Sequence, residues 1–330
     1  MRNGLSALVL GALIVVLASP TYSQTPVAAT ETDPAKSGWA EAEWSLAAGY
    51  RTDQLNWSIA GNLEGNSPTV LSELSWSDIR ILQLKLANRT VIKDRLYVRG
   101  HLDYGTVLSG SNRDSDYAGD NQTREFSRSL NGVDGNHVWD GSVGIGPRFS
   151  FLESALVICP MLGYAVSEQD FNIVDGYQAF SAPPGTTPLG PIAGLNSRYQ
   201  TRWEGFWLGV DLLFSIPLEQ GPFPAMQMVL SGEFHRFDYD ATATWNLRQD
   251  FSQPTSFTHQ ASGSGLAAGA TILLALDPHW GVNFGMNLKK MNADAGVDRV
   301  YYTDGTTRST RLNEVRWRAF TIEAGVSYQF

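Results

Sequence analysis

Apolar and polar residues alternate with a period of two along most of the chain from residue 39 onward. The last segment, FTIEAGVSYQF, shows it best, because Phe320, Ile322, Ala324, Val326, Tyr328 and Phe330 share one face and polar or small residues share the other. Successive side chains of a strand point to opposite faces, so this alternation predicts a strand long enough to cross a bilayer at a tilt. The segments FWLGVDLLFSI, LAAGATILLAL and VNFGMNL repeat the pattern.

Ten segments of this kind can be placed along the sequence. We expect strands near 41–60, 70–87, 95–109, 137–151, 156–171, 200–217, 224–246, 257–276, 281–297 and 307–330. Alternate links are short, such as LES and DPHW, and the others are long and polar, at 110–136, 172–199 and 247–256. Short turns at one end and long loops at the other are typical of outer-membrane barrels. The sequence therefore predicts an all-β, transmembrane antiparallel barrel of about ten strands in the cell outer membrane.

Two segments depart from regular alternation, and the second face of the strands carries charge. In LSWSDIRILQLKL the apolar positions change parity around Ile79 to Leu82, which predicts a β-bulge or a strand that leaves the membrane. Pro160 lacks a backbone donor and predicts interrupted pairing in the fifth strand. The polar face includes Arg99, His101, Asp103, Asp211, Lys289 and Glu323. A barrel of this size with inward charges is expected to have a filled, polar lumen, which weakens a second alternative, a small solute channel.

The first 38 residues predict export. Arg2 precedes the apolar run LSALVLGALIVVLAS and small residues at Thr21 and Ser23, so residues 1–23 are expected to be a signal peptide. The run is shorter than the ~20 residues of a membrane-spanning helix. Residues 24–38 have no periodicity and predict a disordered leader to the barrel of residues 39–330.

Composition removes several classes of function. Cys159 is the only cysteine, which excludes an intramolecular disulfide and a cysteine-based metal cage. The formal net charge is −9 at pH 7, which argues against nucleic acid as a partner. No motif predicts a cofactor or a metal site.

The stretch SNRDSDYAGDN, residues 111–121, concentrates aspartates in the first long link. It permits three interpretations: a solvated loop, a calcium loop, or half of an active site. The acids of DSDYAGDNQTRE partly imitate an EF-hand, but Ala118 occupies a ligand position and strands, not helices, are expected on both sides.

In this region the chain resembles the omptins, a family of outer-membrane proteases. LSELSW, residues 71–76, resembles the Ser-x-Leu-x-Trp stretch of their second strand, and Asp114, Ser115, Asp116 and Tyr117 resemble their Asp-x-Asp-Trp motif with Tyr in place of Trp. The resemblance implies a ten-stranded barrel that extends beyond the membrane on the extracellular side. It also implies that Asp114 and Asp116 form one half of a catalytic site.

The other half of that site departs from the family pattern. Omptins carry Asp-x-His on the seventh strand, and counting along GEFHRFDYDATATWNLR places Asn246 and Arg248 there. Arginine stays protonated and a neutral amide does not stabilise an imidazolium, so neither residue supplies a general base. We therefore expect a binding, adhesion or envelope-structural protein without protease activity. The alternative is an active aspartyl-type endopeptidase in which His259 is a displaced base.

Three cations are expected to face lipid on neighbouring strands. Lys290, Arg316 and Arg318 continue the outward parity of the apolar positions, and their side chains suit the phosphates of lipopolysaccharide. The alternative is that such cations pair with Glu204, Asp294 or Glu314. A chain that ends on Phe330 of its last strand also predicts recognition by the outer-membrane assembly machinery.

Overall fold

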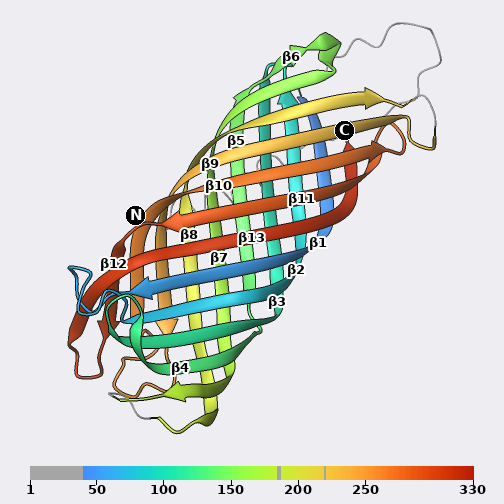
Figure 1. The fold of residues 1–330 in the computed structure, drawn as a ribbon. Helices are drawn as coiled ribbons and strands as arrows, with labels where there is room; N and C mark the ends of the chain where they lie inside the picture. Colours follow the sequence, from blue (N-terminus) through green and yellow to red (C-terminus); the bar gives the residue numbers. More distant parts are fainter. Residues whose placement is uncertain (1–39, 184–186, 219–220) are drawn as a thin grey trace, which may run out of the picture.

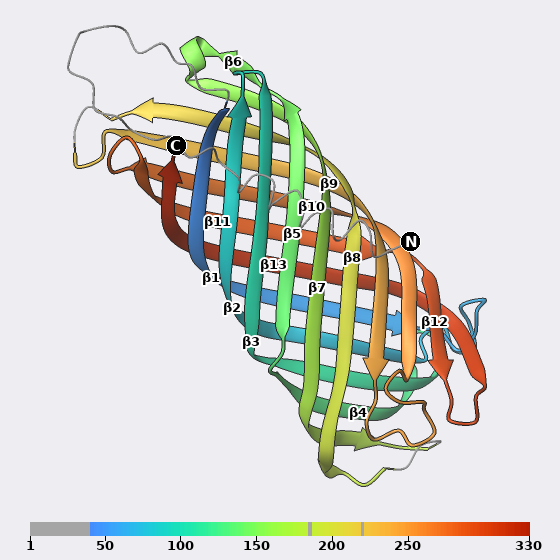
Figure 2. The ribbon, with the colours of Figure 1, turned by 180° about the vertical axis from the view of Figure 1, so that it is seen from behind.

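Strands make up nearly all of the computed structural model, which describes residues 40–183, 187–218 and 221–330 (Figures 1 and 2). They are β1 (Ala40–Ile59), β2 (Ser72–Ile92), β3 (Leu96–Gly119), β4 (Thr123–Asp134), β5 (His137–Pro147), β6 (Phe149–Phe151), β7 (Leu156–Ser181), β8 (Gly190–Pro217), β9 (Ala225–Thr244), β10 (Phe257–Ala275), β11 (Trp280–Ala293), β12 (Gly296–Tyr301) and β13 (Thr307–Gln329). The predicted signal peptide and leader lie outside the described residues.

These strands close into one antiparallel barrel. β4, β5 and β6 follow one another beside β7, and β11 and β12 follow each other between β10 and β13, so the thirteen strands occupy ten positions in the wall. β1 pairs with β13, from Glu43 opposite Gln329 to Trp57 opposite Val315, which closes the ring. The predicted ten-stranded barrel is confirmed. Within the described ranges, no helix is long and apolar enough to cross a bilayer.

The two ends of the barrel differ. The chain terminus and the short turns lie at one end, here called the inner end, and the long hairpins of β3–β4 and β7–β8 lie at the other, the outer end (Figure 1). Toward the inner end the outward face is apolar, with Leu84 61%, Leu208 62% and Leu266 61% exposed. Charged residues face inward at the same height, which is the inverted arrangement of a membrane barrel.

Toward the outer end, the inward face of the strands becomes apolar and the outward face becomes polar. The β1–β2 register shifts between Asp53 and Leu55, and the β2–β3 register shifts between Ser77 and Ile81, with Asp78 at φ 52°. The bulge predicted in this segment is confirmed. Beyond it the inward positions are apolar and aromatic, and they fill the outer end with what we call the outer core. Its largest fully buried members include Trp76, Trp317, Tyr199, Tyr239, Phe171, Leu55, Leu74 and Leu312.

Two predicted long loops are instead mostly strand. β3 continues to Gly119 and β4 begins at Thr123, while β7 continues to Ser181 and β8 begins at Gly190. Asp114 and Asp116 therefore lie on a strand and not in a loop, which also excludes the EF-hand interpretation, since no helix flanks them. The polar residues misled the prediction because strands of the outer end lie in water, where outward positions are hydrophilic.

The expected irregularity at Pro160 is present on one side of its strand. The β5–β7 ladder stops at Ile145 opposite Leu162, and the β6–β7 ladder starts at Phe149 opposite Ile158. Pro160 falls in the gap, where its missing backbone donor removes no ladder bond. On the other side it remains in register with Val210 of β8.

Candidate functional site

Asp114 and Asp116 share the inward face of β3 at the outer end. They stand opposite Leu74 and Ser72 of β2, and both are half-buried. The intervening Ser115 and the following Tyr117 belong to the other face, where the Tyr117 hydroxyl donates a 2.9 Å hydrogen bond to Glu73. The two acids therefore lie side by side above the outer core, as the resemblance to omptins implied.

Their protonation is governed by burial and by each other. Burial raises the pKa of the Asp114 carboxyl well above its ordinary value, and the neighbouring Asp116 carboxylate raises that pKa further. Burial also raises the pKa of Asp116. A hydrogen bond from Ser72 and the positive charge of Arg248 lower the pKa of both acids. The pair therefore holds a proton more readily than exposed aspartates do.

Asn246 and Arg248 follow β9 and have other partners. The Asn246 side chain bonds the backbone of β8, with Oδ1 accepting from the amide of Asn196 at 3.0 Å and Nδ2 donating to the carbonyl of Gly194 at 2.7 Å. Arg248 makes a bidentate ion pair with Asp250 at 2.9 and 2.7 Å and stacks on Phe251. The Asn246 amide thus satisfies backbone groups of β8. The positive charge of Arg248 acts on Asp114 and Asp116.

His259 lies inside the outer core on β10 and has no exposed surface. Its Nδ1 is 2.8 Å from the hydroxyl of Tyr199, its Nε2 is 3.2 Å from the carboxylate of Asp298, and Trp57 packs edge-on against its ring. Both ring nitrogens thus face partners other than Asp114 and Asp116. The structure does not bring the residues of the displaced-base alternative together.

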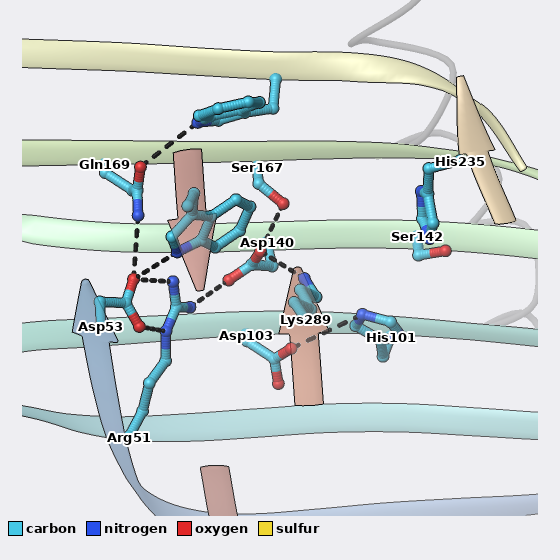
Figure 3. A network of polar contacts seen from close by, with 12 residues as sticks. Arg51, Asp53, His101, Asp103, Asp140, Ser142, Ser167, Gln169, His235 and Lys289 are labelled. Carbon is cyan, nitrogen blue, oxygen red and sulfur yellow. Dashed lines mark hydrogen bonds and ion pairs between the residues drawn. The ribbon is translucent and has the colours of Figure 1, made fainter. Parts of the chain in front are cut away.

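A polar network below the outer core crosses the lumen (Figure 3). Arg51 bonds Asp53 twice at 2.6 Å and Asp140 at 2.5 Å, and Lys289 reaches Asp140 at 2.7 Å from the opposite wall. Ser167 donates to Asp140 at 2.5 Å. We call this set the lumen network. Sequence reasoning missed Arg51, Asp53 and Asp140, although Arg51 and Asp53 occupy alternate positions of one strand and share its inward face.

Further ion pairs fill the lumen toward the inner end. Lys85 contacts Glu323 at 2.9 Å, and Arg99 contacts Asp211 at 2.9 Å and Glu233 at 2.6 Å. A cavity of about 120 Å³ remains between these groups and the lumen network. The polar, filled lumen expected from the inward charges is present. His235 also faces the lumen and contacts Glu233 at 2.7 Å.

The three lipid-facing cations differ in their surroundings. Lys290 of β11 stands directly opposite Arg318 of β13, and neither makes an ion pair with a described residue. Arg316 pairs with Glu314 at 2.7 Å, which is the alternative weighed for it. Lys290 and Arg318 line an external groove of about 690 Å³ together with Leu266, Leu288 and Phe320. The groove joins these two cations to an apolar wall, and Gln54 and Asp78 also line it.

Among the residues that the structure describes, no three His, Cys, Asp or Glu side chains gather closely enough to hold a metal ion.

Several solved structures match the chain. The outer membrane protease OmpT from Escherichia coli matches with a TM-score of 0.70 at 13% identity, over 88% of this chain and 97% of that one. The attachment invasion locus protein Ail of Yersinia pestis covers 88% of this chain and 99% of its own at 10% identity, with a TM-score of 0.28. OprG from Pseudomonas aeruginosa covers 87% and 95% at 10% identity, with a TM-score of 0.33. At such identities the OmpT likeness shows the fold alone.

No curated protein matches the sequence. The profile of the Protochlamydia outer membrane protein family, Pom, matches residues 45–330, which is nearly all of the barrel. With the closed barrel and its apolar outward band, this match establishes an outer-membrane location. The chain belongs to the Protochlamydia outer membrane protein family.

Proposed function

We propose that this protein is a cell-surface barrel of omptin-like architecture that serves binding or adhesion, or an envelope-structural role, and does not cleave peptides. One observation carries the proposal. The acid pair Asp114 and Asp116 faces the cation Arg248 in place of a general base, while His259 is buried in the outer core with Tyr199 and Asp298. Hydrolysis needs a base within hydrogen-bond reach of the attacking water, directly or through one more water.

Peptide hydrolysis tests this proposal. The purified barrel, supplemented with lipopolysaccharide, should leave fluorogenic dibasic peptides intact under conditions where OmpT cleaves them. Asp114→Ala and Asp116→Ala should give the same baseline as the unchanged protein. Hydrolysis that disappears in Asp114→Ala would contradict the proposal, and its loss in His259→Gln as well would support the displaced-base endopeptidase.

The filled lumen also argues against the alternative function of a solute channel. The lumen network crosses the barrel from β1 and β11 to Asp140 of β5, and the outer core fills the space above it with aromatic side chains. A solute would have to break buried ion pairs and then pass a packed apolar layer. Both steps cost several kcal/mol, so the closed form is the stable one.

We also propose that lipopolysaccharide is a partner and that Lys290, Arg316 and Arg318 form its phosphate patch. Lys290 and Arg318 contribute most because neither makes an ion pair with a described residue, whereas Arg316 is held by Glu314. The apolar side chains of Leu266, Leu288 and Phe320 in the same groove suit an acyl chain. A lipid with phosphates above acyl chains matches this order of cations and apolar residues.

Thermal unfolding with and without lipopolysaccharide tests the patch. Added lipopolysaccharide should raise the midpoint of the unchanged protein and raise it less in a Lys290→Ala, Arg318→Ala double variant. Arg316→Ala should fall between the two, and Arg299→Ala, an exposed change on β12, should behave as the unchanged protein. Equal shifts in all four proteins would remove the patch from consideration.

A further inference from the structure

A chain of buried polar groups runs through the outer core, which is otherwise apolar. The Tyr239 and Tyr199 hydroxyls are 2.7 Å apart, and the Tyr199 hydroxyl is 2.8 Å from Nδ1 of His259. His259 Nε2 lies 3.2 Å from Asp298, which accepts a 3.0 Å hydrogen bond from Thr310. All five side chains are buried, with exposed fractions between 0 and 3%. The chain links β9, β8, β10, β12 and β13.

The charge of Asp298 sets the direction of the hydrogen bonds. Its carboxylate lies 3.2 Å from Nε2 of His259 without the geometry of a hydrogen bond, and its negative charge favours a proton on that nitrogen, so the neutral ring leaves Nδ1 as an acceptor. The Tyr199 hydroxyl then donates to Nδ1, and the Tyr239 hydroxyl donates to the oxygen of Tyr199. Tyr199 is therefore a phenol whose proton already points at a base, and that base is backed by a carboxylate.

Aromatic rings surround this phenol. Trp76 stacks on Tyr199 with ring centroids 4.9 Å apart and an interplanar angle of 24°. Trp57 is 6.1 Å from Tyr199 and 6.5 Å from Trp76. On the other side, Trp203 lies 4.4 Å from Tyr239. Indole and phenol side chains are the protein groups that lose an electron most readily. An electron removed from one of these indoles can therefore be replaced by an electron from Tyr199.

We propose that Tyr199 is a redox-active tyrosine that is oxidised with coupled proton transfer to His259. A one-electron, outer-sphere oxidant outside the barrel wall gains one electron and is reduced. Tyr199 supplies that electron, directly or through Trp76, and its phenolic proton moves to Nδ1 of His259. The products are a neutral tyrosyl radical and a His259 imidazolium paired with Asp298. This role is independent of ligand binding at the rim and of the absence of protease activity.

The surroundings favour this site over other tyrosines. Burial raises the pKa of the Tyr199 phenol well above its ordinary value, and the neighbouring Tyr239 raises it further. Oxidation through a free phenolate is thereby suppressed. The coupled route creates no unpaired buried charge, because the new imidazolium lies against Asp298, and burying an uncompensated charge is costly. Tyr302, half-buried near β12, packs against Phe251 and has no histidine partner among its described contacts.

Photochemical oxidation followed by rapid freezing tests the proposal. Laser-excited ruthenium tris-bipyridine with persulfate supplies the outer-sphere oxidant, and electron paramagnetic resonance reports the radical formed in the intact barrel. The unchanged protein should give a neutral tyrosyl signal that Tyr199→Phe abolishes and Tyr302→Phe, the matched control, retains. Identical tyrosyl signals in the unchanged protein and in Tyr199→Phe would overturn the assignment.

Two further measurements separate proton transfer to His259 from simple burial of a phenol. Formation of the radical in the unchanged protein should be slower in D₂O than in H₂O. Asp298→Asn keeps the size of the side chain but removes the counter-charge of the imidazolium, and it should slow formation of the radical. A rate unaffected by both D₂O and Asp298→Asn would refute the coupled transfer, provided that heat-modifiable migration on gels shows both barrels folded.

Discussion

Removal of the Asp140 carboxylate should destabilise the barrel by breaking the lumen network at its centre. Asp140 accepts hydrogen bonds from Arg51, Lys289 and Ser167, and its side chain is only 3% exposed. Asp140→Ala leaves Lys289 without an ion pair and leaves Arg51 with Asp53 alone. Deleting one partner of a buried ion pair typically costs about 3–5 kcal/mol, and we expect a loss of unfolding free energy in that range.

Urea unfolding in lipid vesicles, followed by tryptophan fluorescence, measures this loss. The slope of free energy against urea should stay unchanged, which would assign the effect to stability and not to a change in exposed surface. Asp140→Ala combined with Lys289→Met removes the stranded cation and should recover part of the loss. A single variant within about 0.5 kcal/mol of the unchanged protein, as for an ordinary surface substitution, would refute this account of the network.

Four further predictions follow from other parts of the barrel. Trp76→Ala should open a cavity in the outer core and cost about 3–5 kcal/mol in the same urea assay. Because folding raises the pKa of Asp114, the unfolded chain loses that proton first, so stability should fall as pH rises above the ordinary aspartate range; Asp114→Asn should remove that slope and stabilise the barrel at neutral pH. Epitope tags inserted near Ser181 should be accessible on intact cells, and tags near Glu153 should not. Planar bilayers containing the unchanged protein should show no steady ion conductance, and sustained openings would contradict a closed lumen.

The barrel itself could be predicted from sequence because the alternation inside the hydrocarbon is strict. Lipid on one side and fixed charges on the other leave each position of FTIEAGVSYQF only one face to occupy. The change of parity around Ile79 to Leu82 likewise indicated the bulge, which lies between Ser77 and Ile81. The sequence also placed Asp114 and Asp116 on the same rim as Arg248. The short aspartate motif gave the position of the acids, and counting residues along the seventh predicted strand gave the position of Arg248.

The outer end was harder to predict because its strands stand in water and not in lipid. There water surrounds the wall, so outward residues are polar and SNRDSDYAGDN looks like a loop although most of it is strand. The depth of His259 depends on how β10 pairs with β9 and β12, and cross-strand register is not readable from one sequence. For the same reason the Arg316–Glu314 ion pair and the free state of Lys290 and Arg318 could be posed only as alternatives.

The change of faces at the bulge has a consequence for the bilayer that holds this protein. On β13 the outward apolar residues run from Phe330 up to Phe320, and Arg318 follows at once. At ~3.3 Å per residue and a strand tilt of ~40°, that run spans about 25 Å of hydrocarbon. Sinking deeper would bury Arg318 in acyl chains, and rising would lift Phe320 into the outer headgroups and draw the exposed Asp277 of the inner turn into acyl chains. The barrel is thus matched to a thin bilayer, and in thicker membranes the surrounding lipid should compress around it rather than the protein shift in height.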